Sequence, residues 1–110
     1  MKKFLVIYQS PAESLEQMLK ATPEQKAASM KPWMDWYGKI GEAVVDAGAP
    51  VMRGLAIGKD GSAKPGASDL SGYTIIQAES IEKAQSLLVG HPHNDEANGL
   101  KVELHECIAM

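Results

Sequence analysis

Apolar residues recur along the chain with two different periods, and these periods predict its strands and helices. Residues 3–9 are apolar on both alternating faces, which is typical of a central strand covered on both sides. Residues 51–57 and 72–78 are further apolar stretches rich in strand-forming residues, and they predict a second and a third strand. Residues 100–108 alternate between apolar and polar side chains, so we expect a half-exposed last strand.

Two helix signals follow the first strand. Ser10 and Pro11 open a short helix over residues 11–20. Thr22 opens a longer helical segment with a kink or break at Pro32. The apolar positions of the longer segment recur at the helical period: Met30, Trp33, Met34, Tyr37, Ile40, Gly41, Val44 and Val45. Gly48, followed by Pro50, predicts the end of this helix.

A third helix and a long loop complete the pattern. Ser80 predicts the start of a helix over residues 81–89, and Gly90 with Pro92 predicts its end. Residues 58–70 carry turn signals and are expected to form a loop, either a flexible hairpin extension or a lid.

The resulting order, β-α-β-β-α-β, predicts an α+β protein with the ferredoxin-like βαββαβ fold. Right-handed crossovers place the first and third strands in the centre of a four-stranded antiparallel sheet, with the helices on one face. The other face would expose apolar residues of the two central strands, and such a patch is large for a monomer. We therefore predict a homodimer in which two sheets pack face to face.

Composition narrows the class of protein. The 110 residues suit a single domain over 1–110, and 45% apolar with 23% charged residues is ordinary for a globular protein. A net charge of −3 without a basic block argues against nucleic acid or an acidic membrane as partner. No stretch approaches the roughly 20 apolar residues of a membrane span, and the apolar start of the chain stops at Gln9 without a cleavage site. The one cysteine, Cys107, fits a reducing compartment, so we expect a cytoplasmic protein.

Several motifs spread over the chain carry a resemblance to a known family. They are the opening strand at 4–8, Asp46-Ala47-Gly48 with Gly54 after it, the stretch from Ser71 to Ser80, and Gly90-His91-Pro92-His93 followed by residues 102–104. In these motifs the chain resembles the YCII-related family of dimeric α/β-barrel proteins. The resemblance implies a cleft between sheet and helices that the partner chain partly lines. It also implies an acid–base His–Asp pair, in which Asp46 matches the Asp, but no His stands near Met34 where the His would lie.

Candidate chemistry is concentrated in the segment 91–95. His91 and His93 could act as general acid and base at the mouth of a cleft, because imidazole titrates near neutral pH. With Asp95 they could also supply three metal ligands, but Gly90 and Pro92 are explained by helix termination and the spacing is weak, so no metal site is predicted. The identity of any cofactor is not indicated by the sequence.

Other candidates each have a structural alternative. Asp46 is a third catalytic candidate, although a solvated helix face explains it as well. Trp36, at the flank of the apolar stripe that also holds Trp33 and Tyr37, could edge a ligand cleft or belong to the core. Tyr8 is a further ligand-binding candidate, and Arg53 could bind an anionic ligand or pair with a glutamate.

Two functions fit these observations. The first is a small-molecule enzyme that uses a cleft histidine as acid or base, with an aromatic or carboxylate-bearing metabolite as substrate. The second is a non-catalytic homodimeric binding or accessory protein that uses the same cleft.

Overall fold

The elements of the protein form an α+β arrangement in which strands precede and follow the helices. The computed structural model describes residues 1–52, 54–66 and 69–109, without the side chain of Leu15. The elements are β1 (Lys2–Gln9), α1 (Ala12–Lys20), α2 (Pro23–Ile40), the 3-10 turn η1 (Gly41–Ala43), β2 (Val44–Pro50), β3 (Leu55–Ile57), β4 (Ala63–Pro65), β5 (Leu70–Ala78), α3 (Ile81–Leu87), the 3-10 turn η2 (Glu96–Asn98) and β6 (Lys101–Glu106). Within the described residues, none of the helices is long and apolar enough to span a membrane.

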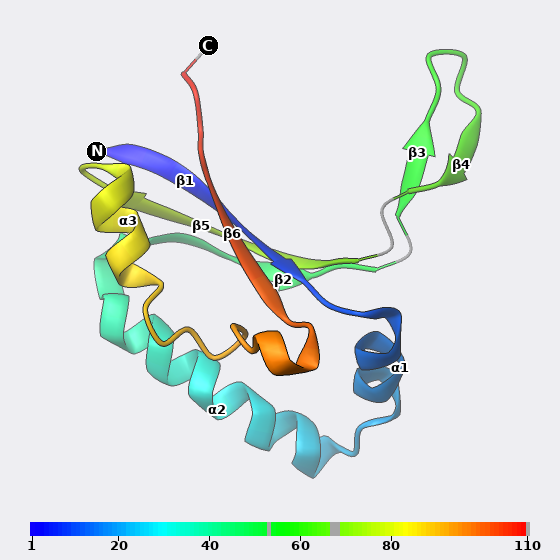
Figure 1. Cartoon of the computed structure of the whole chain (residues 1–110), viewed down its shortest axis with the longest axis horizontal. Helices are drawn as coiled ribbons and strands as arrows, with labels where there is room; N and C mark the ends of the chain where they lie inside the picture. Colours follow the sequence, from blue (N-terminus) through cyan, green and yellow to red (C-terminus); the bar gives the residue numbers. More distant parts are fainter. Residues whose placement is uncertain (53, 67–68, 110) are drawn as a thin grey trace.

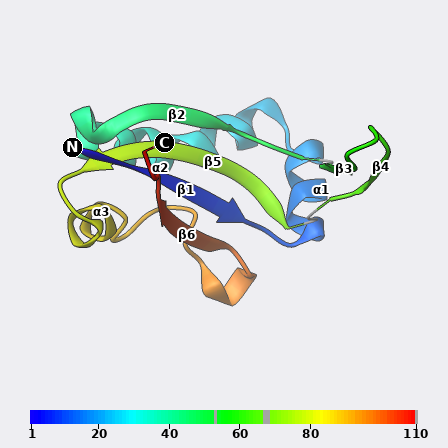
Figure 2. The same cartoon turned by 90° about the horizontal axis from the view of Figure 1, so that it is seen from above.

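A four-stranded antiparallel sheet with the strand order β2-β5-β1-β6 is the main layer. β1 and β5 are central, and β2 and β6 form the two edges. α2 and α3 lie on the same face of this sheet (Figures 1 and 2). The predicted antiparallel sheet with helices is therefore confirmed. The strict β-α-β-β-α-β succession is not observed, because two helices follow β1 and a separate hairpin, β3–β4, stands between β2 and β5.

The core lies between the sheet and the two helices on its face. Strand alternation turns one side of β1 and β5 toward the helices. These strands supply Phe4, Val6, Tyr8, Ile76 and Ala78, α2 supplies Trp36 and Ile40, and α3 supplies Ala84. Val102 and Leu104 of β6 pack against this cluster while their neighbours are exposed, as the alternating pattern of the last strand predicts.

The long helix ends earlier than its apolar pattern predicts. α2 runs through Pro32 without a break and ends at Ile40, where Gly41 has φ +53°. The chain then enters the edge strand β2, which begins at Val44. A β-branched pair, Val44 and Val45, suits a strand, and pairing with β5 satisfies the backbone there. Tertiary pairing therefore overrides the helical reading of this segment.

Gly48 has a different role from the one predicted. It lies inside β2 with φ +75°, and a Cβ at this position would be 1.8 Å from the carbonyl oxygen of Tyr73. A side chain is thus excluded both by the backbone conformation and by the close approach of β5. Gly48 is required by an irregularity in strand pairing and not by the end of a helix.

The predicted second strand is shorter than expected, and the predicted loop after it contains a further short strand that forms a hairpin. β3 covers only Leu55–Ile57 and pairs with β4, within the predicted loop, to form a short antiparallel hairpin. A tight turn closes the hairpin: the Gly58 N–H donates to the Ser62 carbonyl at 2.7 Å, and the Ser62 N–H and hydroxyl both donate to Asp60. These donors hold the pKa of Asp60 below its usual value. Figure 1 shows the hairpin projecting from one end of the sheet.

Helix starts follow the predicted capping signals in part. The Thr22 hydroxyl accepts from the Gln25 N–H and the Gln25 side chain accepts from the Thr22 N–H, which completes the capping box of α2. Ser80 likewise caps α3 with its side chain. Ser10 does not cap α1, whose N-cap is Pro11; its hydroxyl donates to Ser71 on β5 instead.

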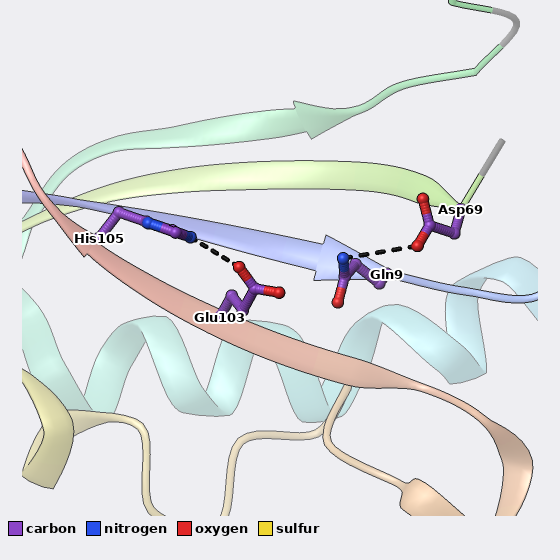
Figure 3. Close-up of polar contacts among 4 residues, drawn as sticks. All are labelled: Gln9, Asp69, Glu103 and His105. Atoms are coloured by element: carbon purple, nitrogen blue, oxygen red, sulfur yellow. Dashed lines mark hydrogen bonds and ion pairs between the residues drawn. The ribbon is translucent and has the colours of Figure 1, made fainter. Parts of the chain in front are cut away.

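The sheet face opposite α2 and α3 has an apolar centre and a polar rim. Leu5 lies beside Ile75, and Ile7 lies beside Tyr73, on neighbouring strands of this face, and all four side chains are half-buried. Polar pairs flank them (Figure 3): His105 lies 2.7 Å from Glu103 on β6, and the Gln9 amide donates to Asp69 at 3.5 Å. We call the four apolar residues Leu5, Ile7, Tyr73 and Ile75 the open-face patch.

Gly48→Ala should lower the free energy of unfolding by at least about 2 kcal/mol, because both the positive φ and the Tyr73 carbonyl oppose a Cβ. The control is Gly38→Ala, in the interior of α2, where a Cβ would meet nothing within 4 Å. This substitution should stabilise by about 0.5–1 kcal/mol through helix propensity. Urea denaturation measures both, and equal effects at the two positions would contradict the assigned role of Gly48.

Candidate functional site: a histidine cluster beneath an aromatic wall

A chain of buried polar groups connects the segment after α3 with three strands of the sheet. His91 Nε2 lies 3.0 Å from the Tyr8 hydroxyl on β1. That hydroxyl lies 2.9 Å from Thr74 Oγ1 on β5, and Thr74 donates to the Ala47 carbonyl of β2 at 3.1 Å. His91 is only 3% exposed and Thr74 is fully buried. Four elements distant in sequence are therefore joined by three consecutive hydrogen bonds in the core.

The donors and acceptors of this chain assign the protons. The backbone N–H of His93 donates to His91 Nδ1 at 3.0 Å, so Nδ1 carries a lone pair and no proton. The neutral His91 ring then holds its proton on Nε2 and donates it to Tyr8. Tyr8 in turn donates to Thr74, because Thr74 uses its own proton on the Ala47 carbonyl. Each group donates its proton to one partner, so the hydrogen bonds run in one direction, from His91 through Tyr8 and Thr74 to the Ala47 carbonyl.

Burial keeps both ring systems of the chain uncharged. Desolvation, with a smaller contribution from His93, lowers the pKa of His91 from 6.5 to about 4. Desolvation also raises the pKa of the Tyr8 phenol above its ordinary value, and the hydrogen bond to Thr74 only partly offsets this. At neutral pH His91 is therefore a neutral core residue with both nitrogens engaged.

Two tryptophans of α2 enclose His91. The ring of Trp36 lies 4.3 Å from that of His91 and the ring of Trp33 lies 4.7 Å from it, both at T-shaped angles. Trp36 is buried and donates its indole N–H to the Leu87 carbonyl of α3 at 2.9 Å, which makes it a core residue that ties the two helices together. Trp33 is only half-buried and lies edge-on to Tyr8 at 4.9 Å, so it forms the outer wall of the cluster.

His93 occupies a different position from His91, although the two are neighbours in sequence. It is half-buried, and its Nε2 lies 3.0 Å from the Gln9 carbonyl oxygen, which can only accept. Nε2 therefore carries a proton, and the ring is oriented by the backbone of β1. Among the described residues, no hydrogen bond to His93 Nδ1 is found. The ring lies 5.2 Å from Tyr8 and 6.1 Å from Trp33.

The remaining predicted site residues do not join this cluster. Asp46 lies in β2, where its carboxylate accepts from the Gly48 N–H at 2.8 Å, so it supports the irregular turn of the edge strand and not a helix face. Arg53 lies outside the described residues. Tyr8 and Trp36, predicted as ligand contacts, are both 4% exposed and lie in the core. Of the predicted residues, the structure thus brings together His91, His93, Tyr8 and Trp36.

The arrangement of side chains around His91 and His93 does not suit metal binding. Within the described part of the chain, no group of three or more His, Cys, Asp or Glu side chains lies close enough to hold a metal ion. The Nδ1 lone pair of His91 is already used by the His93 N–H, and Nε2 carries a proton. His91 therefore has no lone pair to give a metal without losing its place in the core.

Two hollows on the surface lie elsewhere. One of about 520 Å³ is lined by Pro11, Glu13, Ser14, Gln17, Asn98 and Leu100, between α1 and the segment before β6. Another of about 310 Å³ lies beside the start of α3 and includes Glu42, Gln77 and Lys83. Neither is lined by a histidine, so His93 and Trp33 meet solvent at the surface and not inside these hollows.

Two members of the cluster were not singled out by the sequence as chemical groups. Thr74 is the lone hydroxyl among inward positions of β5, between Gly72 and Ile76, and this pattern is the signal that a buried polar partner exists. Trp33 was grouped with the core aromatics, but its half-exposed position is set by where α2 crosses the sheet. No local pattern gives that crossing.

Comparisons with known proteins add no assignment. No family model matches the chain, and no curated protein matches its sequence.

Acid should weaken the contribution of His91 to stability. Its folded pKa of about 4 lies below the usual 6.5, so the unfolded chain binds the proton more tightly. The stabilisation is fully present above pH 6.5 and is lost as the pH falls toward 4, by roughly 3 kcal/mol over that window. Denaturation of wild type and His91→Gln at pH 7 and pH 4 measures this loss.

Wild type should be the more stable protein at pH 7, and its advantage over His91→Gln should shrink at pH 4. Carboxylates that titrate in the same range are common to both proteins and cancel in the difference. An advantage that does not change between pH 7 and pH 4 would show that His91 is not held neutral by the core.

Proposed function

We propose that this chain is a ferredoxin-like, dimeric α/β-barrel protein of the YCII-related type that acts on a small molecule, with His93 as general acid and base. The observation that carries the proposal is the state of His93. Its Nε2–H is fixed on the Gln9 carbonyl, its ring is half-buried, and Nδ1 has no hydrogen bond among the described residues. An imidazole oriented through one nitrogen, with a lone pair on the other, is suited to proton transfer.

The surroundings of His93 favour an aromatic ligand. Trp33 is half-exposed beside it, with its ring 6.1 Å away, and Tyr8 closes the inner side. A planar ring can stack or pack edge-on against these side chains while the imidazole exchanges a proton with it. His91 takes a different part: it positions the segment by accepting the His93 N–H. His91 and Asp46, both engaged in structural hydrogen bonds, are not needed as proton carriers in this proposal.

A second function, non-catalytic ligand binding, is favoured by one observation. Among the described residues, no carboxylate is hydrogen-bonded to either imidazole of the cluster; the partners are Tyr8 and backbone groups. The His–Asp pair that the family resemblance implies is thus not formed by His93 and Asp46. A site without such a pair can still bind an aromatic molecule, and the experiment below separates binding from turnover.

Phenylpyruvate is a suitable probe because it combines an aromatic ring, a carboxylate and an exchangeable C–H. In D₂O, the wild-type protein should accelerate exchange of that proton, as followed by NMR, and His93→Gln should reduce the protein-dependent rate at least about 100-fold. Glutamine can still donate an N–H to the Gln9 carbonyl but cannot act as the base. The matched control is His105→Gln, on the opposite sheet face, which should leave the rate unchanged.

The outcomes distinguish the two functions. Binding of phenylpyruvate at His93, seen as chemical-shift changes, without any accelerated exchange would support the non-catalytic function. Neither binding nor exchange with phenylpyruvate would contradict the proposal of an aromatic substrate at this site.

The homodimer is part of the same proposal. The open-face patch presents Leu5, Ile7, Tyr73 and Ile75 between polar flanks, the pattern of an apolar interface core with a polar rim. A second copy turned by a two-fold axis would bring the same patch against itself. We further propose a cytoplasmic location, because the single cysteine, Cys107, is free and exposed.

Ile75→Lys should weaken the dimer, because it places a charge in the middle of the open-face patch. Sedimentation velocity should show a dimer for wild type at protein concentrations of roughly 10–100 μM, where an interface of modest affinity is occupied, and a monomer for the variant. The control is Ile81→Lys, the same change at a residue of α3 that is 45% exposed on the other side of the sheet. A wild-type protein that sediments as a monomer would contradict the proposed dimer.

A further inference from the structure

The β3–β4 hairpin has one apolar face and one mixed face. Leu55 pairs with Pro65 and Ile57 pairs with Ala63, so these four side chains share one face. Ala56 and Lys64 pair with each other on the opposite face. Leu55 and Ile57 are each 65% exposed, which is far more than a packed strand leaves open. We call Leu55, Ile57, Ala63 and Pro65 the apolar face of the hairpin.

The hairpin is ordered by its own hydrogen bonds and yet lies outside the core. Its base is closed by the Gly66 N–H, which donates to the Gly54 carbonyl at 2.9 Å, and its tip by the turn at Asp60. None of its residues belongs to the core cluster or packs against it as a partly buried hydrophobic. A two-stranded hairpin is only marginally stable in water unless its apolar face is covered. We therefore expect the apolar face of the hairpin to be covered by a surface that is not part of the described residues.

Its direction indicates which surface that is. The hairpin leaves the sheet where β2 ends and β5 begins, and it rises on the side away from α2 and α3 (Figures 1 and 2). This is the side of the open-face patch. The segment that follows β6 rises on the same side (Figure 1). A body seated on the open-face patch would have the hairpin beside it at one end of the sheet.

We propose that the β3–β4 hairpin is a dimerisation arm whose apolar face packs against a second copy of this chain. The inference rests on the proposed sheet-to-sheet dimer and extends it, since one body, the partner, covers both the open-face patch and the arm. Two-fold symmetry makes the contact reciprocal, so each dimer contains two arm contacts. Part of the predicted loop 58–70 thereby gains a role, because its β4 strand completes the arm.

The test uses two neighbouring residues that point to opposite faces of β3. Ile57→Lys places a charge on the apolar face, and Ala56→Lys places the same charge on the other face. Sedimentation equilibrium gives the dimer dissociation constant, and circular dichroism checks the fold of both variants. Ile57→Lys should raise the dissociation constant by roughly tenfold to 100-fold, from the loss of a buried side chain in each arm. Ala56→Lys should change it by less than about twofold.

Failure of the arm and failure of the dimer give different results. Equal dissociation constants for Ile57→Lys and wild type, with Ile75→Lys still breaking the dimer, would overturn the arm and leave the sheet-face contact in place. Equal weakening by Ile57→Lys and Ala56→Lys would also overturn it, because the effect would then not depend on the apolar face. A wild-type protein that is monomeric at 100 μM would overturn both the arm and the dimer.

Discussion

The hydrogen-bond chain from His91 through Tyr8 and Thr74 to the Ala47 carbonyl is the constraint on which the rest of the structure depends. It joins the segment after α3 to β1, β5 and the edge strand β2 across the middle of the core. Burying any of these polar groups without its hydrogen-bond partner would cost free energy. The row of hydrogen bonds is therefore stable only when all four elements are in place. An apolar core of the same volume would tolerate shifts of these elements that the polar chain does not.

This constraint also explains why two neighbouring histidines have different chemistry. His91 is fixed inside, neutral, with no lone pair left for a ligand. The Nδ1 of His91 accepts the backbone N–H of His93 and so fixes the backbone of this segment. The His93 ring then reaches the Gln9 carbonyl at the edge of the core. The buried His91 thus positions the half-buried His93. The proposed acid–base role depends on this division, since a single imidazole cannot be both a satisfied core residue and a free base.

Part of this organisation could be predicted from the sequence. The central position of β1 and β5 in the sheet, the capping signals of Thr22 and Ser80, and the helix that precedes the histidines were predicted from sequence patterns and are confirmed. The end of α2 was not, because Val44 fits a helical stripe and a strand equally well and pairing with β5 decides between them. The prediction that Gly48 ends a helix was wrong for the same reason, because only the approach of the Tyr73 carbonyl in the folded protein shows why a glycine is needed there. The contact of Tyr8 with His91 spans 83 positions, and no local pattern reports it.

The most direct measurement of the central claim is the protonation state of the imidazole nitrogens, from long-range ¹H–¹⁵N NMR correlations at pH 7. We expect His91 to be neutral, with its proton on Nε2 and an unprotonated Nδ1 that accepts a hydrogen bond. The resonances of His91 should stay unchanged as the pH is lowered to about 5, above the pKa of about 4 that burial imposes. A His91 that is protonated on Nδ1, or that titrates near 6.5 like a solvent-exposed imidazole, would contradict this expectation.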